Sequence, residues 1–198
     1  VPHFRAKRNG VFVTIASTAG VRPRPGLTWY NGSKGAAIVT SRSMAAELAK
    51  DNIRVNTINA GLVLTPAGGA LMPMLLPFGL GLGGPLGSGG QWWSFIALDD
   101  LLHLIHHVLM NDSVRGPVNA TSPEPVTNAD FTKILGRVLK RPAVIPVPRF
   151  ALELLLGEMN GPLLLASARV NPEKALDAGF AFSYPALEPA LRHVLGRV

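Results

Sequence analysis

The hydrophobic pattern near the N-terminus predicts a strand followed by a long helix. Residues 11–16 (VFVTIA) are all β-branched or apolar, which is typical of a buried parallel strand. Two prolines and a glycine in residues 22–26 predict a loop, because they interrupt regular structure. Apolar residues then recur at helical spacing from about residue 27 to residue 50, which predicts a helix.

A second apolar run follows this predicted helix. Residues 53–64 (IRVNTINAGLVL) predict another strand, with a turn at Ala60 and Gly61. A strand, a long helix and a second strand form a βαβ unit, which requires a parallel sheet with a right-handed crossover. Before it, residues 4–8 predict the last turn of a helix that ends at Asn9 and Gly10. The pattern therefore indicates the α/β class.

Residues 55–98 carry no charge, which raises the question of a membrane span. Four prolines and a glycine-rich stretch interrupt the segment, so no continuous run of about 20 apolar helix formers remains. Residues 79–84 match the letters of a G-x-G-x-x-G phosphate-binding turn, but no strand precedes them and Pro85 follows. We therefore expect residues 79–84 to form a flexible loop over the functional site, and we expect no contact of the protein with a membrane.

Short strands and helices are predicted for the second half of the chain. Residues 92–96 and 118–120 predict strands. Asp99 and Thr127 are each expected to cap the start of a helix, the second covering residues 128–139. Prolines predict extended chain over residues 141–148, and further helices are expected around residues 150–157, 163–169, 172–178 and 187–195.

Three histidines raise the possibility of a metal site. His103, His106 and His107 have the i, i+3, i+4 spacing that can bring two imidazoles to one ion. No cysteine and no Glu-x-x-His accompanies them, so we interpret them as helix surface and core edge, without a metal.

Composition and charge narrow the class of protein. The 198 residues are 47% hydrophobic and contain no cysteine, which predicts a globular protein in a reducing compartment such as the cytoplasm. The first ten residues lack the apolar core of a signal peptide. All of the net charge of +7 lies in residues 1–56, but those basic residues are scattered and have no interleaved aromatic residues, so we expect no nucleic-acid partner.

Candidate chemistry gathers around the first predicted strand and helix. Tyr30 and Lys34 are four residues apart and therefore lie on one helix face, where the ammonium favours the phenolate. Ser17 ends the predicted strand, at the sheet edge where α/β proteins expose site residues. A serine, a tyrosine and a lysine suit proton transfer to or from an alcohol or carbonyl oxygen.

These residues resemble the short-chain dehydrogenase/reductase family. The S-T-A-G at residues 17–20 and the Tyr30-x-x-x-Lys34 pair match its serine and its tyrosine–lysine motif. The resemblance implies that Tyr30 is the acid/base and that Ser17 binds the substrate oxygen. It implies that Lys34, with Tyr30, contacts NAD or NADP, that Gly61 and Thr65 belong to the cofactor site, and that Thr65 touches the nicotinamide amide.

The resemblance changes along the chain. Residues 1–60 resemble the single-domain branch of the family, whereas residues 61–198, including LLLASARV and GFAFSYPALEPAL, resemble the epimerase-like extended branch. We therefore expect a partial Rossmann-like βαβ segment at residues 1–66. Residues 67–198 are expected to add the last sheet strand and a small helix-rich substrate cap.

The glycine-rich, pyrophosphate-binding half of the family's nucleotide domain has no counterpart before residue 11. We expect a truncated or fused form of an NAD(P)-dependent oxidoreductase or epimerase, acting on a small carbonyl, alcohol or sugar-nucleotide substrate. The alternative hypothesis is an inactive remnant or interaction module, which pairs through an exposed edge strand. A homo-oligomer is a further expectation, and the sequence does not identify the substrate.

Overall fold

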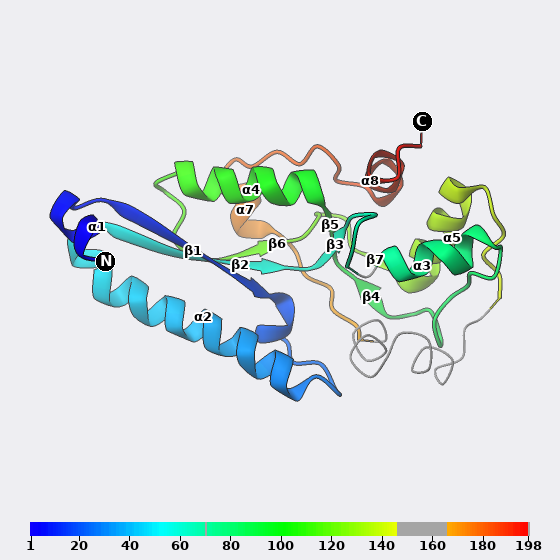
Figure 1. Cartoon of the computed structure of the whole chain (residues 1–198), viewed down its shortest axis with the longest axis horizontal. Coiled ribbons are helices and arrows are strands. Elements are labelled where there is room, and N and C mark those ends of the chain that lie inside the picture. The colour runs from blue at the N-terminus through cyan, green and yellow to red at the C-terminus, as the bar shows by residue number, and fades with distance from the viewer. Residues whose placement is uncertain (70, 146–165, 198) are drawn as a thin grey trace.

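A three-stranded parallel sheet forms one end of the molecule (Figure 1). The structure is a computed structural model, and it describes residues 1–69, 71–145 and 166–197. Its strand order is β1-β2-β6. β1 (Gly10–Ser17) pairs with β2 (Ile53–Ala60), and β2 pairs with β6 (Gly116–Ala120). The crossover between β1 and β2 contains α2 (Thr28–Leu48). The predicted βαβ unit and the α/β class are confirmed.

Two helices cover opposite faces of this sheet (Figure 1). On one face, Ile53 and Val55 of β2 pack against Leu48 of α2. On the other face, α4 (Leu98–Met110) packs its apolar side on β2 and β6. Burial on both faces explains why β2 is apolar or uncharged at almost every position.

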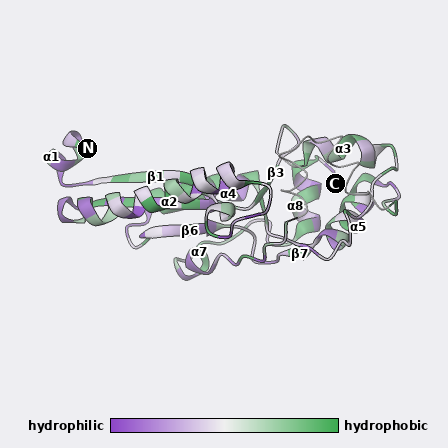
Figure 2. Cartoon of the chain, turned by 90° about the horizontal axis from the view of Figure 1, so that it is seen from below, coloured by the Kyte–Doolittle hydropathy of each residue, from purple (hydrophilic) through white to green (hydrophobic). Residues whose placement is uncertain are grey.

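A smaller, helix-rich part adjoins the carboxyl ends of the strands (Figures 1 and 2). Two short pairings lie here: β3 (Leu62–Leu64) with β5 (Phe95–Ala97) in parallel, and β4 (Trp92–Trp93) with β7 (Val126–Thr127) antiparallel. Three helices, α3 (Met72–Gly79), α5 (Asn128–Leu139) and α8 (Leu187–Val194), surround the largest apolar cluster. The division of the chain into segments 1–66 and 67–198 remains a prediction, because α4 and β6 of the second segment belong to the main sheet layer.

Four shorter elements complete the described structure. They are α1 (Pro2–Lys7), the 3-10 turns η1 (Thr18–Gly20) and η2 (Ala49–Asp51), and α7 (Glu173–Asp177). The helices predicted around residues 172–178 and 187–195 are therefore confirmed as α7 and α8. The helix predicted over residues 150–157 lies outside the described residues. Of the helix predicted over residues 163–169, residues 163–165 also lie outside them, and residues 166–169 are described and are not helical.

The strand predicted over residues 92–96 is wrong, because two separate strands occupy it. The chain bends at Ser94, whose carbonyl accepts from the backbone N–H of Leu62 at 2.8 Å. The Ser94 hydroxyl donates to the Ala168 carbonyl at 2.8 Å and accepts from the Val170 N–H at 2.9 Å. Because these partners are distant in sequence, the local pattern does not reveal the bend.

The capping role predicted for Asp99 is also wrong. α4 is preceded by Ala97, without a side-chain cap, and Asp99 lies in the first turn, where it pairs with His193 of α8. The buried carboxylate of Asp100 instead accepts from the backbone N–H groups of Ser183 and Tyr184, at 2.8 and 2.9 Å. Thr127 does cap α5, since its hydroxyl accepts from the Asp130 N–H at 3.1 Å.

The proline-interrupted segment contains a helix that the sequence did not predict. α3 begins with Pro73 in its first turn, where a missing N–H costs nothing. The following glycine-rich loop packs against residues 142–145, and the Ile145 N–H donates to the Gly83 carbonyl at 3.2 Å. It follows a helix rather than a strand, so it lacks the context of a phosphate-binding turn.

Arg54 provides a test of how α4 is held on the sheet. Its buried guanidinium donates to the carbonyls of Val108 and Leu109 at 2.9 and 2.7 Å, and pairs with Asp112 at 3.1 Å. Arg54→Met leaves these helix-end carbonyls unpaired, so we expect unfolding free energy to fall by about 2–3 kcal/mol in urea denaturation. The control Arg42→Met, on the exposed side of α2, is expected to change it by less than about 0.5 kcal/mol. Equal losses in the two variants would contradict the anchoring role.

A second test concerns the contact between η1 and α2. A Cβ on Gly20 would lie 2.7 Å from the backbone carbon of Lys34, so Gly20→Ala forces the helix away. We expect a loss of about 1–3 kcal/mol and a lower melting temperature. Gly32, in the same helix, has nothing within 4 Å of its Cβ position, so Gly32→Ala is expected to stabilise by about 0.5–1 kcal/mol. If both alanines change the melting temperature in the same direction, this close contact does not determine the helix position.

Candidate active site

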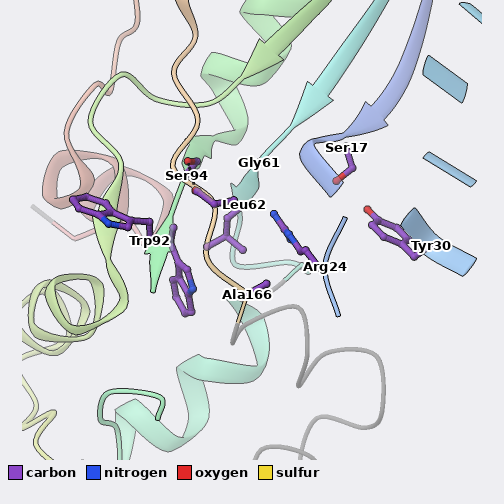
Figure 3. A pocket seen from close by; sticks show the side chains of 10 residues that line it. Ser17, Arg24, Tyr30, Gly61, Leu62, Trp92, Ser94 and Ala166 are labelled. Atoms are coloured by element: carbon purple, nitrogen blue, oxygen red, sulfur yellow. Dashed lines mark hydrogen bonds between the residues drawn. The ribbon is translucent and has the colours of Figure 1, made fainter. Parts of the chain in front are cut away.

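A cavity of about 90 Å³ lies where β1 and β2 end (Figure 3). In open α/β sheets, ligands bind beyond the carboxyl ends of the strands. The lining residues come from both halves of the chain: Ser17, Arg24, Tyr30, Gly61, Leu62, Trp92, Trp93, Ser94, Ala166 and Ala168. Three of the five predicted site residues are therefore brought to one cavity.

Ser17 ends β1 and is only 7% exposed. Its hydroxyl oxygen accepts from the Ala19 N–H at 3.2 Å, which caps η1. A serine hydroxyl also has one proton to donate, and no acceptor among the described residues takes it. Ser17 is therefore held in place while its O–H remains available to an oxygen in the cavity.

Tyr30 lies in the first turn of α2 and extends toward the same cavity. Figure 3 shows its hydroxyl and that of Ser17 facing a common space. The start of the helix has no side-chain cap; instead, the Asn31 N–H donates to the Leu27 carbonyl and the Asn31 amide donates to the Arg24 carbonyl, both at 2.8 Å. These bonds fix the preceding loop to the helix turn that positions Tyr30.

Lys34 lies one helical turn after Tyr30 in α2. Its Nζ is 5.8 Å from the centroid of the Tyr30 ring and donates to the Ile15 carbonyl of β1 at 3.3 Å. Lys34 does not line the cavity itself. The structure thus brings Ser17, Tyr30 and Lys34 together, with two hydroxyls at the cavity and the ammonium beside the ring.

Gly61 lies at the cavity, whereas Thr65 lies outside its lining. Gly61 lines the cavity, and a Cβ there would lie 2.4 Å from the Ser94 carbonyl oxygen, so the close approach of these two backbones requires glycine. Thr65 follows β3, and its hydroxyl accepts from the Ala67 N–H at 3.3 Å. Thr65 is not among the cavity-lining residues, and its contact with a cofactor remains a prediction.

Arg24 is a site residue that the sequence analysis missed. It lines the cavity, and its Nη2 donates to the Thr18 hydroxyl at 3.1 Å. Burial lowers the pKa of the Arg24 guanidinium, and the nearby Tyr30 phenol, when ionised, raises it. In the sequence, Arg24 is one of several scattered basic residues and lies in a proline-rich loop, so nothing marks it as a site residue. Its burial beside Tyr30 depends on how that loop folds.

The far wall of the cavity is aromatic and comes from the second half of the chain. Trp92 and Trp93 line it, and the Arg169 guanidinium stacks 4.7 Å from the Trp92 ring centroid. The Trp93 ring packs edge-on against Phe131 at 4.9 Å, which links this wall to the largest apolar cluster.

Two other kinds of site were considered from the sequence. Within the described ranges, no group of three or more His, Asp or Glu side chains is arranged to hold a metal ion. His107 lies 3.1 Å from the Ala178 carbonyl and packs edge-on against Phe180, in agreement with the core-edge interpretation. No helix in the part of the chain that the structure describes has the length and hydropathy to cross a membrane.

Comparisons with known proteins identify the family of this chain. Residues 1–75 match the family described as short chain dehydrogenase, and residues 147–194 match a domain of unknown function, DUF1731. The epimerase family protein SDR39U1 of Bos taurus is 40% identical over 159 residues, which cover 80% of this chain and 54% of that protein. Its chloroplastic homolog from Arabidopsis thaliana is 44% identical over 147 residues, covering 74% of this chain and 42% of that protein.

A solved structure extends the similarity to the fold. The crystal structure of human epimerase family protein SDR39U1 (isoform 2) with NADPH superposes with a TM-score of 0.79 at 32% identity, covering 95% of this chain and 66% of that chain. The chain spans about half the length of the curated relatives it matches. From its fold, its motif residues and these relatives, the chain belongs to the short-chain dehydrogenase/reductase superfamily, in its epimerase-like extended branch.

Proposed function

We propose that this chain provides the acid–base site of an NAD(P)-dependent oxidoreductase or epimerase. The observation that supports this most directly is the shared cavity of Ser17 and Tyr30, with Lys34 beside the Tyr30 ring. Two hydroxyls that face one space can bind and protonate a single substrate oxygen. The relative whose structure contains NADPH supports NADP or NAD as the cofactor.

Lys34, beside the cavity, fits the ribose at the nicotinamide end of such a cofactor. An ammonium has three donors, and the described contacts of Lys34 use one of them, on Ile15. The remaining two are available to the ribose hydroxyls, as the family resemblance implies. When bound, the nicotinamide supplies or accepts a hydride at the substrate carbon.

Residues of the chain then bind the substrate oxygen and transfer a proton to it. In the reducing direction, the carbonyl π electrons pass to the oxygen as the carbon gains hydride, and Tyr30 gives its phenolic proton to that oxygen. Ser17 donates a hydrogen bond to the same oxygen and stabilises its developing negative charge. The positive charge of Lys34 stabilises the phenolate that remains on Tyr30. In the oxidising direction the same steps run in reverse.

The substrate class we propose is a carbonyl or alcohol compound, with sugar nucleotides included because of the epimerase-like branch. A reducing, cytoplasmic location and a homo-oligomer remain predictions. The Arabidopsis relative is described as chloroplastic.

A second candidate function is an interaction module. β1 is one of the two outer strands of the sheet in the described structure, and Ile15 on it is 49% exposed. An unpaired strand edge with an exposed apolar side chain is a template for pairing with another chain. This function requires no chemistry at Tyr30, which is how the two candidates are distinguished.

Tyr30→Phe tests the enzymatic proposal. Removing the phenolic proton is expected to lower kcat for NADPH-dependent reduction of an aldehyde and ketone panel by about 10²–10⁴-fold. Tyr184→Phe changes the only other tyrosine, which lies outside the cavity and stacks on His193, and is expected to retain wild-type kcat.

Cofactor binding is measured in parallel by NADPH fluorescence. Turnover that survives Tyr30→Phe unchanged would refute the assigned acid/base. Absence of any fluorescence change or thermal shift at millimolar NADPH would favour the interaction module.

A further inference from the structure

Arg24 is held at the cavity with part of its hydrogen-bonding capacity unused. The guanidinium has five N–H donors, and one of them, on Nη2, binds the Thr18 hydroxyl. Its Nε is buried and has no hydrogen-bond partner. Figure 3 shows the side chain extending toward Gly61 and Leu62, across the space that Tyr30 also faces.

No carboxylate in the described part of the chain neutralises this cation. In residues 1–56 the only acidic side chains are Glu47 and Asp51, and both pair with Arg5. A partly buried cation without a counter-ion is costly, and so is a buried donor without an acceptor. An anion that binds in the cavity would remove the first of these costs, because it would balance the charge of the guanidinium.

The cavity is therefore lined by polar groups of two kinds. Ser17 and Tyr30 present neutral hydroxyls, whereas Arg24 presents a positive charge in fork geometry. We infer that the substrate carries an oxyanion, a carboxylate or a phosphate, close to the reacting oxygen, and that Arg24 binds this oxyanion while Ser17 and Tyr30 bind the reacting oxygen. The inference rests on the proposed function for the identity of that oxygen.

The size and walls of the cavity support the same substrate class. At about 90 Å³, the cavity is well below the roughly 300–1,000 Å³ of typical ligand sites, so it admits only the reacting end of a molecule. None of the residues that line it is acidic, and Trp92, Trp93 and Leu62 are among its apolar lining. A compact carbonyl with an adjacent oxyanion matches both the volume and the charge of this end.

Two matched pairs of probes separate the two oxyanions. 2-Oxobutanoate and butanone test the carboxylate, and dihydroxyacetone phosphate and dihydroxyacetone test the phosphate. Dissociation constants are measured by ligand-observed NMR on the full chain, without turnover. We expect at least one charged probe to bind the wild-type protein about tenfold or more tightly than its neutral partner, since charge-assisted hydrogen bonds to arginine are among the strong ones.

Three variants test whether Arg24 causes the tighter binding of the charged probes, which we call the charge preference. Arg24→Met is expected to abolish it and Arg24→Lys to retain part of it, because lysine keeps the charge but not the fork geometry. Arg22→Met removes an equal charge two residues away, outside this cavity, and is expected to retain the full preference. Circular dichroism confirms that each variant is folded, and Arg24→Lys serves if Arg24→Met is not.

The outcomes separate this inference from the proposed function. A charge preference that Arg24→Met abolishes supports the inference even where no carbonyl is reduced. Equal binding of charged and neutral probes, no binding of either charged probe at millimolar concentration, or loss of the preference in Arg22→Met to the same degree would overturn it.

Discussion

The site depends on the close packing of one backbone against another. The turn after β1 touches α2 at Gly20, where there is no room for a side chain against the Lys34 backbone. This contact sets the distance between the end of β1 and the first turns of the helix. Because Ser17 lies just before the turn and Tyr30 one helical turn before Lys34, it also places the two hydroxyls at one cavity. The parallel pairing of β1 with β2 then fixes the floor of that cavity at Gly61.

The cavity also depends on segments far apart in sequence. The Ser94 hydroxyl bonds to the chain at Ala168 and Val170, and this brings the tryptophan wall and the later segment to the end of the main sheet. The first part of the chain thus provides Ser17, Arg24 and Tyr30, and the second part provides the tryptophan wall that partly encloses them. Electrostatic interactions with a substrate are stronger in such partly enclosed surroundings than in bulk water.

The sequence predicted the elements whose signals are local. β1, α2 and β2 have clear hydrophobic patterns, and the spacing of Tyr30 and Lys34 needs only a helix to bring them together. α3 was missed because its uniformly apolar sequence has no polar face and its prolines suggested a loop. The bend at Ser94 was missed because it is set by partners distant in the sequence. The burial of Arg24 was missed because it depends on how the proline-rich loop folds between Thr18 and Tyr30. The placement of Ser17 and Tyr30 near each other was thus predictable, whereas the charge beside them was not.

The central claim is that Tyr30 lies with its ring beside Lys34 and its hydroxyl at a shared cavity. It is tested most directly by nuclear Overhauser contacts from selectively labelled tyrosine rings, since the chain has only two tyrosines. We expect contacts from the Tyr30 ring to the Lys34 side chain. Contacts of the Tyr184 ring with His193, whose centroids are 4.3 Å apart, serve as the internal reference. A spectrum that shows the Tyr184 contacts but none from Tyr30 to Lys34, Arg24 or Ser17 would contradict it.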